Sequence, residues 1–405
     1  MIWLLVPVAV YSVGIFTLWL ILRRRHAGIP TAAGPLPRVT VVVSARNEEK
    51  TILPLLEGLS QQDYPTDLLE IIIVNDNSTD RTPIVVSEFT ESIRQRSALN
   101  IRLIFNPFPG KKRAIKYGIE KSSGELILTT DADCTLSPGW VSAHAREYFA
   151  GGENAHAAVF GAGRESAQAM SIGAGNASSY AGAGGAWSAD MILGEVCQGA
   201  PGGFVALFGM FEFSALQAIT EAAVVAGRPV MCNAANMSFR REVYLKHSGE
   251  LRADLPSGDD MFLLHAVRRA GGRVRYAGSS AAAVETAGAV TAAALLRQRA
   301  RWASKTFYYS DAATLTLAAA TAACNAAVTA AAVASVISPA HIPILAALYG
   351  VRLVPDYLIT ARNIKKRGGK VPALPFILSE LIYPFYFMTV GVMSLFPAAR
   401  RFGKR

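Results

Sequence analysis

Residues 125–140 read ELILTTDADCTLSPGW, and the interpretation of the whole chain starts from this stretch. A run of apolar and β-prone residues leads directly into Asp131 and Asp133, which are one residue apart. Two carboxylates this close repel each other unless a cation lies between them, and Mg²⁺ and Mn²⁺ prefer such oxygen ligands. The alternative is that these aspartates only form a turn or cap a helix. We therefore predict a strand that ends at a divalent cation and the nucleotide diphosphate that it binds.

Strands and helices alternate on the N-terminal side of this stretch. Continuous apolar runs predict buried strands within RVTVVVSARNEE (38–49), LLEIIIVNDNSTD (68–80) and NIRLIFN (100–106). The leucine spacing of TILPLLEGLSQQ (51–62) predicts a helix between the first two. This alternation predicts an α/β fold with a mostly parallel sheet covered by helices on both faces. Because ligands bind at the carboxyl ends of strands in such sheets, we expect three polar clusters to converge there: Ser44–Glu49, Asn75–Asp80 and Asp131–Asp133.

The first 22 residues have the composition of a membrane segment. They contain no charge, and about 20 residues suffice to cross the hydrocarbon core. The basic run RRRH follows at 23–26, whereas a cleaved signal peptide would carry its positive charge before a shorter apolar run. We therefore predict a retained anchor at 1–22 that leaves the following body of the chain on the cytoplasmic side of the plasma membrane.

The C-terminal third is apolar again, at 313–337, 342–360 and 371–397. Arg352 and Asp356 interrupt the second of these segments, and because charges are costly in lipid we expect them to face protein or to pair with each other. Basic residues flank the last segment on both sides, and a single crossing cannot place both basic ends in the cytoplasm. Either this segment is re-entrant or interfacial, or one basic end lies outside.

Composition narrows the class of partner. The formal net charge is +10, but only 17% of the residues are charged and 51% are hydrophobic. A basic balance can indicate nucleic acid, an anionic membrane surface or anionic substrates. Much of the positive charge flanks apolar segments, so we expect a membrane and no nucleic acid. The four cysteines have no paired spacing, which disfavours a zinc site and a disulfide framework.

Five motifs, in this order, resemble those of membrane-bound family 2 glycosyltransferases, inverting GT-A enzymes that include the cellulose and hyaluronan synthases. The motifs are VVVSARNEE, IIIVNDNSTD, GKKRAIKYGIEKSSGELILTTDAD, SGDDMFLL and QRARW. The resemblance covers roughly 38–145 and 205–310. It implies a Rossmann-like GT-A domain at 38–310, after the N-terminal anchor and before transmembrane or interfacial helices at 313–397.

The resemblance implies roles for residues on the donor side of the reaction. Asp76 matches the family's uridine-binding aspartate, and Lys112 matches a basic position near the nucleotide. Asp131 and Asp133 match the motif that binds the metal, Mg²⁺ or Mn²⁺, and the diphosphate. The first nucleotide loop is matched by Ser44, Ala45, Asn47 and Glu48.

It also implies roles on the acceptor side. Asp260 matches the general base, with Asp259 beside it. The alternative for this pair is a simple role at a helix N-terminus, which is compatible with catalysis. The Q-x-x-R-W motif, which lies near the acceptor and the diphosphate, is matched by Gln298, Arg301 and Trp302. An amphipathic basic helix on the membrane surface is the other interpretation of this last motif.

The implied activity is a metal-dependent, inverting transfer of a sugar from a UDP-sugar to a membrane-lipid-linked or glycan acceptor. A processive polysaccharide synthase and a non-catalytic membrane scaffold are the alternatives. A nucleotidyltransferase is disfavoured, because its early phosphate loop would be rich in glycine and basic, whereas SARNEE is acidic and has no glycine. The Gly- and Ala-rich segment 150–203 matches the family poorly and is interpreted as a mobile loop.

Overall fold

The computed structural model describes residues 2–24, 35–149, 188–199, 202–255 and 257–396. The chain divides into two compact units. The sheet unit comprises 24–196 and 232–286, and the helical unit comprises 1–23, 197–231 and 287–405. Residues 197–231 and 287–310 therefore group with the apolar helices, while the predicted domain limits 38–310 stay a prediction.

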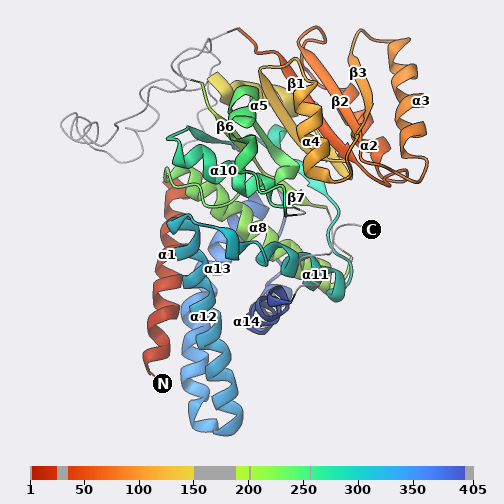
Figure 1. The fold of residues 1–405 in the computed structure, drawn as a ribbon. Helices are drawn as coiled ribbons and strands as arrows, with labels where there is room; N and C mark the ends of the chain where they lie inside the picture. Colours follow the sequence, from red (N-terminus) through yellow and green to blue (C-terminus); the bar gives the residue numbers. More distant parts are fainter. Residues whose placement is uncertain (1, 25–34, 150–187, 200–201, 256, 397–405) are drawn as a thin grey trace, which may run out of the picture. The chain divides into compact units, whose positions relative to one another are not determined.

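The sheet unit contains a seven-stranded sheet with the order β3-β2-β1-β4-β8-β6-β9. Strands β1, β2 and β3 lie side by side in Figure 1. The strands are β1 (Val39–Ala45), β2 (Leu69–Asn75), β3 (Asn100–Phe105), β4 (Leu126–Asp131), β6 (Met191–Gly194), β8 (Met237–Arg240) and β9 (Val274–Ala277). Strands β1 to β4 run parallel to one another, β8 runs antiparallel to both β4 and β6, and β9 runs parallel to β6. The predicted mostly parallel sheet is confirmed, and the predicted strands lie where the continuous apolar runs placed them.

Helices cover this sheet and lead into its strands. They are α2 (Ile52–Ser60), α3 (Thr82–Arg94), α4 (Lys111–Glu120), α5 (Trp140–Phe149), α9 (Arg241–His247) and α10 (Asp259–Arg269). A small antiparallel pair, β5 (Cys134–Leu136) and β10 (Val284–Thr286), follows the site stretch. Gly118 allows α4 to lie directly on the sheet, because a Cβ atom there would come within 2.5 Å of Val42 Cγ1 and 2.9 Å of Val74 Cγ2.

A buried carboxylate ties the central strands to the turn before β4. Glu70 of β2 is 6% exposed and accepts hydrogen bonds from Thr40 Oγ1 at 2.8 Å and from the Ser123 amide at 2.9 Å. Arg102 of β3 donates to its other oxygen at 2.7 Å. Burial alone would raise the pKa of Glu70, but these hydrogen bonds favour the ionised form and lower it.

The helical unit contains long apolar helices. Its elements are α1 (Leu5–Arg24), α8 (Phe204–Val225), α11 (Ala292–Ala303), α12 (Ala312–Ile337), α13 (Ile342–Lys366) and α14 (Ala373–Leu395). Among the described residues, five helices are long and apolar enough to cross a membrane: α1, α8, α12, α13 and α14, where the first and fourth are extended by short 3₁₀ turns. The sequence analysis did not predict α8 as such a helix. Val8, Val328 and Leu348 pack together and join α1, α12 and α13 (Figure 1).

A polar cluster lies inside this helical unit. The Arg352 side chain is 1% exposed and donates to Asp356 Oδ2 at 3.1 Å, to Glu380 Oε2 at 3.0 Å and to Asn325 Oδ1 at 3.2 Å. Tyr11 of α1 donates to the other oxygen of Asp356 at 2.8 Å. The predicted pairing of Arg352 with Asp356 is confirmed, and partners from α12 and α14 complete it.

Most of the poorly matching segment lies outside the described residues. Its residues 150–187 and 200–201 are among those that the structure does not describe, so the loop interpretation is not tested there. Residues 188–199, in contrast, are almost entirely buried and include β6 and β7 (Val196–Gln198). The end of this segment therefore belongs to regular secondary structure, and it was wrongly included in the predicted loop.

Candidate nucleotide-sugar site

The carboxyl ends of three adjacent strands meet at one edge of the main sheet. Ser44 of β1 is in register with Asp131 of β4 on one side and with Val74 of β2 on the other. The amide of Asp76 donates to the carbonyl of Ala45 at 2.8 Å. The polar clusters after β1, β2 and β4 therefore converge, as the sequence predicted.

The loops after β1 and β2 are held together by hydrogen bonds. Asn47 adopts a left-handed backbone with φ of 56°, which asparagine tolerates, and its Oδ1 accepts from the Thr79 amide at 2.8 Å. The Glu48 amide donates to Thr82 Oγ1 at 2.7 Å. Asp80 in turn accepts from the Thr82 amide at 3.0 Å, which is a structural role. The two loops therefore form one preorganised edge, and the predicted substrate contacts of Asn47 and Glu48 stay predictions.

Asp76 lies just beyond β2 and is 3% exposed. Its Oδ1 accepts from Asn106 Nδ2 at 2.9 Å and from the Gly110 amide at 2.8 Å. Asp76 thereby fixes the loop that leads from β3 into α4. The predicted contact of Asp76 with uridine stays a prediction. The structure adds a second, structural role for Asp76 in holding this loop.

Lys111, the first residue of α4, reaches the site. Its ammonium group donates to Asp131 Oδ1. Burial alone would lower the pKa of Lys111, but the charge of Asp131, followed by those of Asp259 and Asp260, outweighs burial and raises it. Lys111 therefore keeps its positive charge in contact with Asp131, and the negative charges of Asp259 and Asp260 also favour this charged form.

The neighbouring Lys112 points elsewhere. Its Nζ donates to the carbonyls of Leu251 at 2.9 Å and Arg252 at 3.0 Å, and it lies 5.2 Å from the Phe262 ring centroid. Successive residues of an α-helix point about 100° apart, so only one of two adjacent lysines can face Asp131. The sequence analysis named Lys112 and missed Lys111. The role of Lys112 near the nucleotide stays a prediction.

Asp259 and Asp260 begin α10, after Gly258 with φ of 95° in the left-handed region. Asp260 Oδ2 accepts from the Ala234 amide at 3.2 Å, which fixes the carboxylate. Asp259 is buried, and burial together with the charge of Asp260 raises its pKa. Two adjacent carboxylates at a helix N-terminus, one with a raised pKa, suit a site that must accept a proton.

Residues 40–171 match the family model described as Glycosyl transferase family 2. This region is a family 2 glycosyltransferase domain. The chain is 40% identical over 104 residues to the probable glycosyltransferase YdaM of Bacillus subtilis and 32% identical over 124 residues to the beta-monoglucosyldiacylglycerol synthase of Nostoc sp.. These matches cover 25% and 31% of this chain and only 24% and 26% of those proteins.

A solved structure is similar over nearly its whole length. The mannosyltransferase PcManGT from Pyrobaculum calidifontis, solved with GDP-Man and Mn²⁺, matches with a TM-score of 0.53 and 18% identity. The match covers 96% of this chain and 99% of that one. At this identity the likeness establishes the fold alone, and it confirms the predicted GT-A architecture.

Gln298, Arg301 and Trp302, the residues of the Q-x-x-R-W motif, lie in α11, within the helical unit. Gln298, Arg301 and Trp302 are all partly exposed. Their predicted approach to the acceptor and the diphosphate stays a prediction. Arg299 of the same helix contacts two of them, Gln298 and Trp302.

The fit of a divalent cation to the family 2 domain depends on Asp131, which ends β4, and on Asp133, which lies in the turn between β4 and β5. Within the described ranges, no three or more His, Cys, Asp or Glu side chains gather as a metal site. Mg²⁺ and similar cations, however, often take only one or two carboxylates and complete their shell with water and substrate phosphates. Asp131 and Asp133 match that donor set. Burial raises the pKa of the adjacent Cys134 thiol to about 12, so it stays protonated and is a poor ligand.

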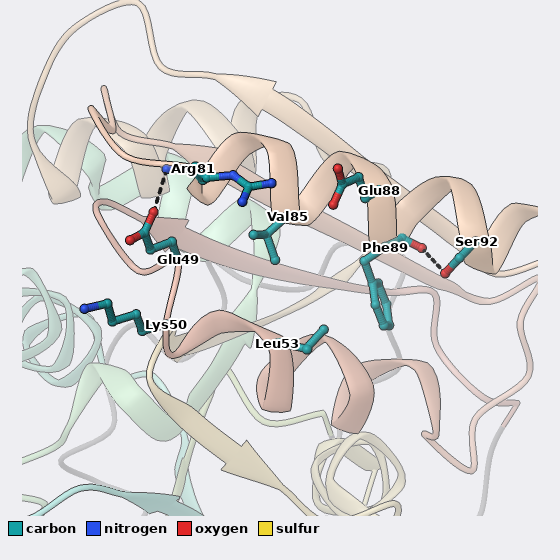
Figure 2. Close-up of a pocket in the computed structure, with 8 residues that line it drawn as sticks. All are labelled: Glu49, Lys50, Leu53, Arg81, Val85, Glu88, Phe89 and Ser92. Carbon is teal, nitrogen blue, oxygen red and sulfur yellow. Dashed lines mark hydrogen bonds between the residues drawn. The ribbon is translucent and has the colours of Figure 1, made fainter.

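A cavity of about 610 Å³ lies between α2 and α3 (Figure 2). Glu49 accepts from the Arg81 amide at 3.0 Å on one side of it, and Leu53 and Phe89 provide apolar walls. Glu49 is the last residue of the Ser44–Glu49 cluster, but none of the residues to which the family resemblance gives a role lines this cavity. We therefore look for the chemistry at the strand ends and not in the cavity.

Proposed function

We propose that the protein transfers a sugar from a UDP-sugar to a membrane-lipid-linked or glycan acceptor, with Mg²⁺ or Mn²⁺ and with inversion at the anomeric carbon. The observation that carries this proposal is Asp131 at the end of β4, in a family 2 glycosyltransferase domain, joined to Lys111 and through its charge to Asp259 and Asp260. A basic group suits a diphosphate, and acidic groups suit a divalent cation and the proton of an incoming hydroxyl.

In the proposed mechanism, one proton moves to Asp260, and one bond at the anomeric carbon is replaced by another. Asp260 takes the proton of the acceptor hydroxyl while that oxygen attacks the anomeric carbon. The bond from that carbon to the diphosphate oxygen breaks on the opposite face, and its electron pair leaves with the diphosphate. Lys111 binds the diphosphate through a charge-assisted hydrogen bond. Asp131 and Asp133 would hold the divalent cation, which when bound would neutralise charge on the leaving group.

A membrane acceptor is favoured by the helical unit. Five of the described helices are long and apolar enough to cross a bilayer. One relative is named a beta-monoglucosyldiacylglycerol synthase, a name that specifies a glycolipid product. We propose that the catalytic domain faces the cytoplasm, where nucleotide sugars are made. A cysteine at the exposed Ser87 of α3 should resist impermeant labelling in intact cells, and external labelling would overturn this topology.

The activity is tested with the full chain in detergent. Radiolabelled UDP-sugars are offered with Mn²⁺ and a panel of diacylglycerol and polyprenyl-phosphate acceptors, and the label in the lipid phase is counted. Asp133→Ala should abolish transfer, while Asp67→Ala, a change at an exposed aspartate of the same unit, should not. Transfer by Asp133→Ala at the wild-type rate would contradict the proposed site.

A further inference from the structure

Arg299 lies inside the Q-x-x-R-W motif of α11, between residues that the family resemblance assigns to substrate binding. Its side chain is only 4% exposed. Its Nη1 donates to Gln298 Oε1 at 2.6 Å, and its Cζ lies 4.3 Å from the centroid of the Trp302 ring. Arg299 therefore contacts two of the three motif residues at once, and all these contacts lie within the helical unit.

The hydrogen bond between Arg299 and Gln298 has a defined direction, from the guanidinium group to the side-chain amide. A guanidinium group only donates hydrogen bonds, so the Gln298 group that faces it must be the amide oxygen. The Gln298 amide nitrogen is consequently turned away from Arg299. Gln298 can therefore offer both of its N–H donors to a substrate, whereas one of the two lone pairs of its oxygen is already used by Arg299. This arrangement favours a substrate atom that accepts hydrogen bonds, such as a hydroxyl oxygen.

The contact with Trp302 limits that residue in a similar way. A cation over an indole ring is attracted to the electron-rich face of the ring. Arg299 takes one face of Trp302, and a sugar ring can stack only against the opposite face. The indole cannot rotate without losing this contact, so Arg299 fixes the orientation of the stacking surface.

Two other helices hold Arg299 in place. Glu212 of α8 accepts from its Nε at 2.9 Å, and Tyr386 of α14 donates to Glu212 at 3.1 Å. Phe213 lies 5.6 Å from the guanidinium carbon. The Arg299 Nη2 atom is buried and makes no hydrogen bond to any described residue. Buried polar atoms without a partner are costly, so a chain that only needed packing here would gain from an apolar side chain.

We propose that Arg299 is a positioning residue that presents Gln298 as a hydrogen-bond donor and Trp302 as a one-sided stacking surface for the sugar acceptor. This inference rests on the proposed function, since it concerns the acceptor of that reaction. It also links the motif to the apolar helices α8 and α14, through Glu212 and Tyr386.

The test compares Arg299→Met with the matched control Arg362→Met. Arg362 of α13 also pairs with a buried glutamate of α8, Glu221, at 2.8 and 3.2 Å, but it does not belong to α11. Arg299→Met should lower sugar transfer about 100-fold, because a displaced positioning group typically costs that much. UDP affinity measured with Mn²⁺ should stay within about twofold of the wild type, because the residues proposed to bind the uridine and the metal, Asp76, Asp131 and Asp133, are unchanged.

A double-mutant cycle separates positioning from general destabilisation. Gln298→Ala should lower transfer strongly in the wild type and only slightly in the Arg299→Met background, because the two residues act as one unit. Arg299→Lys keeps the charge over Trp302 and should restore part of the rate. Equal losses in Arg299→Met and Arg362→Met, or an undiminished effect of Gln298→Ala in both backgrounds, would overturn the proposal.

Tryptophan fluorescence distinguishes failure of this inference from failure of the proposed function. The emission assigned to Trp302, obtained by subtracting the Trp302→Phe spectrum, should change in Arg299→Met and not in Arg362→Met. An unchanged emission would overturn the positioning role. Absence of any transfer by the wild-type protein would contradict the proposed function. The fluorescence measurement would still show whether Arg299 holds Trp302.

Discussion

Replacing Lys111 by methionine should move two binding constants in opposite directions. The Lys111 side chain is 43% exposed and Asp131 is 32% exposed, so their ion pair is partly solvated. Pairs of this kind contribute about 0.2–1 kcal/mol. Removing the ammonium group relieves Asp131 of a competing cation, so Mn²⁺ should bind up to about fivefold more tightly when no nucleotide is present. A charge-assisted hydrogen bond to the diphosphate contributes about 1.5–3 kcal/mol, and its loss should weaken UDP binding about 10- to 150-fold.

Isothermal titration calorimetry measures both constants, first with Mn²⁺ alone and then with UDP at saturating Mn²⁺. Lys116→Met is the matched control, because Lys116 lies on the same helix, is 47% exposed and pairs with Glu120 at 3.9 Å. That change should leave both constants unaltered. Weakening of both constants in Lys111→Met, or an unchanged UDP affinity, would refute the assignment of Lys111 to the diphosphate.

Three further predictions concern catalysis and stability. Asp260→Asn should lower transfer about 10²–10⁴-fold with UDP affinity retained, and a near wild-type rate or a product of retained configuration would contradict its role as the base. Glu70→Gln should lower the free energy of unfolding by about 1.5–3 kcal/mol in chemical denaturation. Because the pKa of Glu70 is lowered from its ordinary 4.5, the stability it confers is present above that pH and is lost as pH falls through the lowered value, so Glu70→Gln should show a weaker acid dependence. Arg352→Met leaves Asp356 and Glu380 without their counter-charge and should cost about 3–5 kcal/mol, measured as a loss of the folded protein on heating in detergent; an unchanged melting temperature would show that the cluster contributes no stability.

The sheet and the site edge could be predicted because their signals are local in sequence. Every residue of β2 is buried, and the continuous apolar run at 71–74 predicts this without any tertiary information. The carboxyl ends of such strands lie at one edge of a parallel sheet, so the clusters that contain Ser44 and Asp131 could be placed at the same edge in advance, whereas their pairing in register could not.

The rest depends on contacts between residues far apart in the chain. The choice between Lys111 and Lys112 is set by the angle at which α4 lies on the sheet, to which Gly118 contributes and which no local pattern reports. Glu380 and Glu212 likewise come from separate helices, and neither the spacing of charges nor hydropathy identifies their arginine partners.

The central claim is that Asp131 and Asp133 hold a divalent cation that binds a nucleotide diphosphate. Its most direct test is calorimetry of UDP with the full chain in detergent, once with Mn²⁺ and once with EDTA, together with Asp133→Ala. We predict binding with Mn²⁺, none with EDTA, and none in the variant under either condition. The same UDP affinity in EDTA as in Mn²⁺ would contradict the claim.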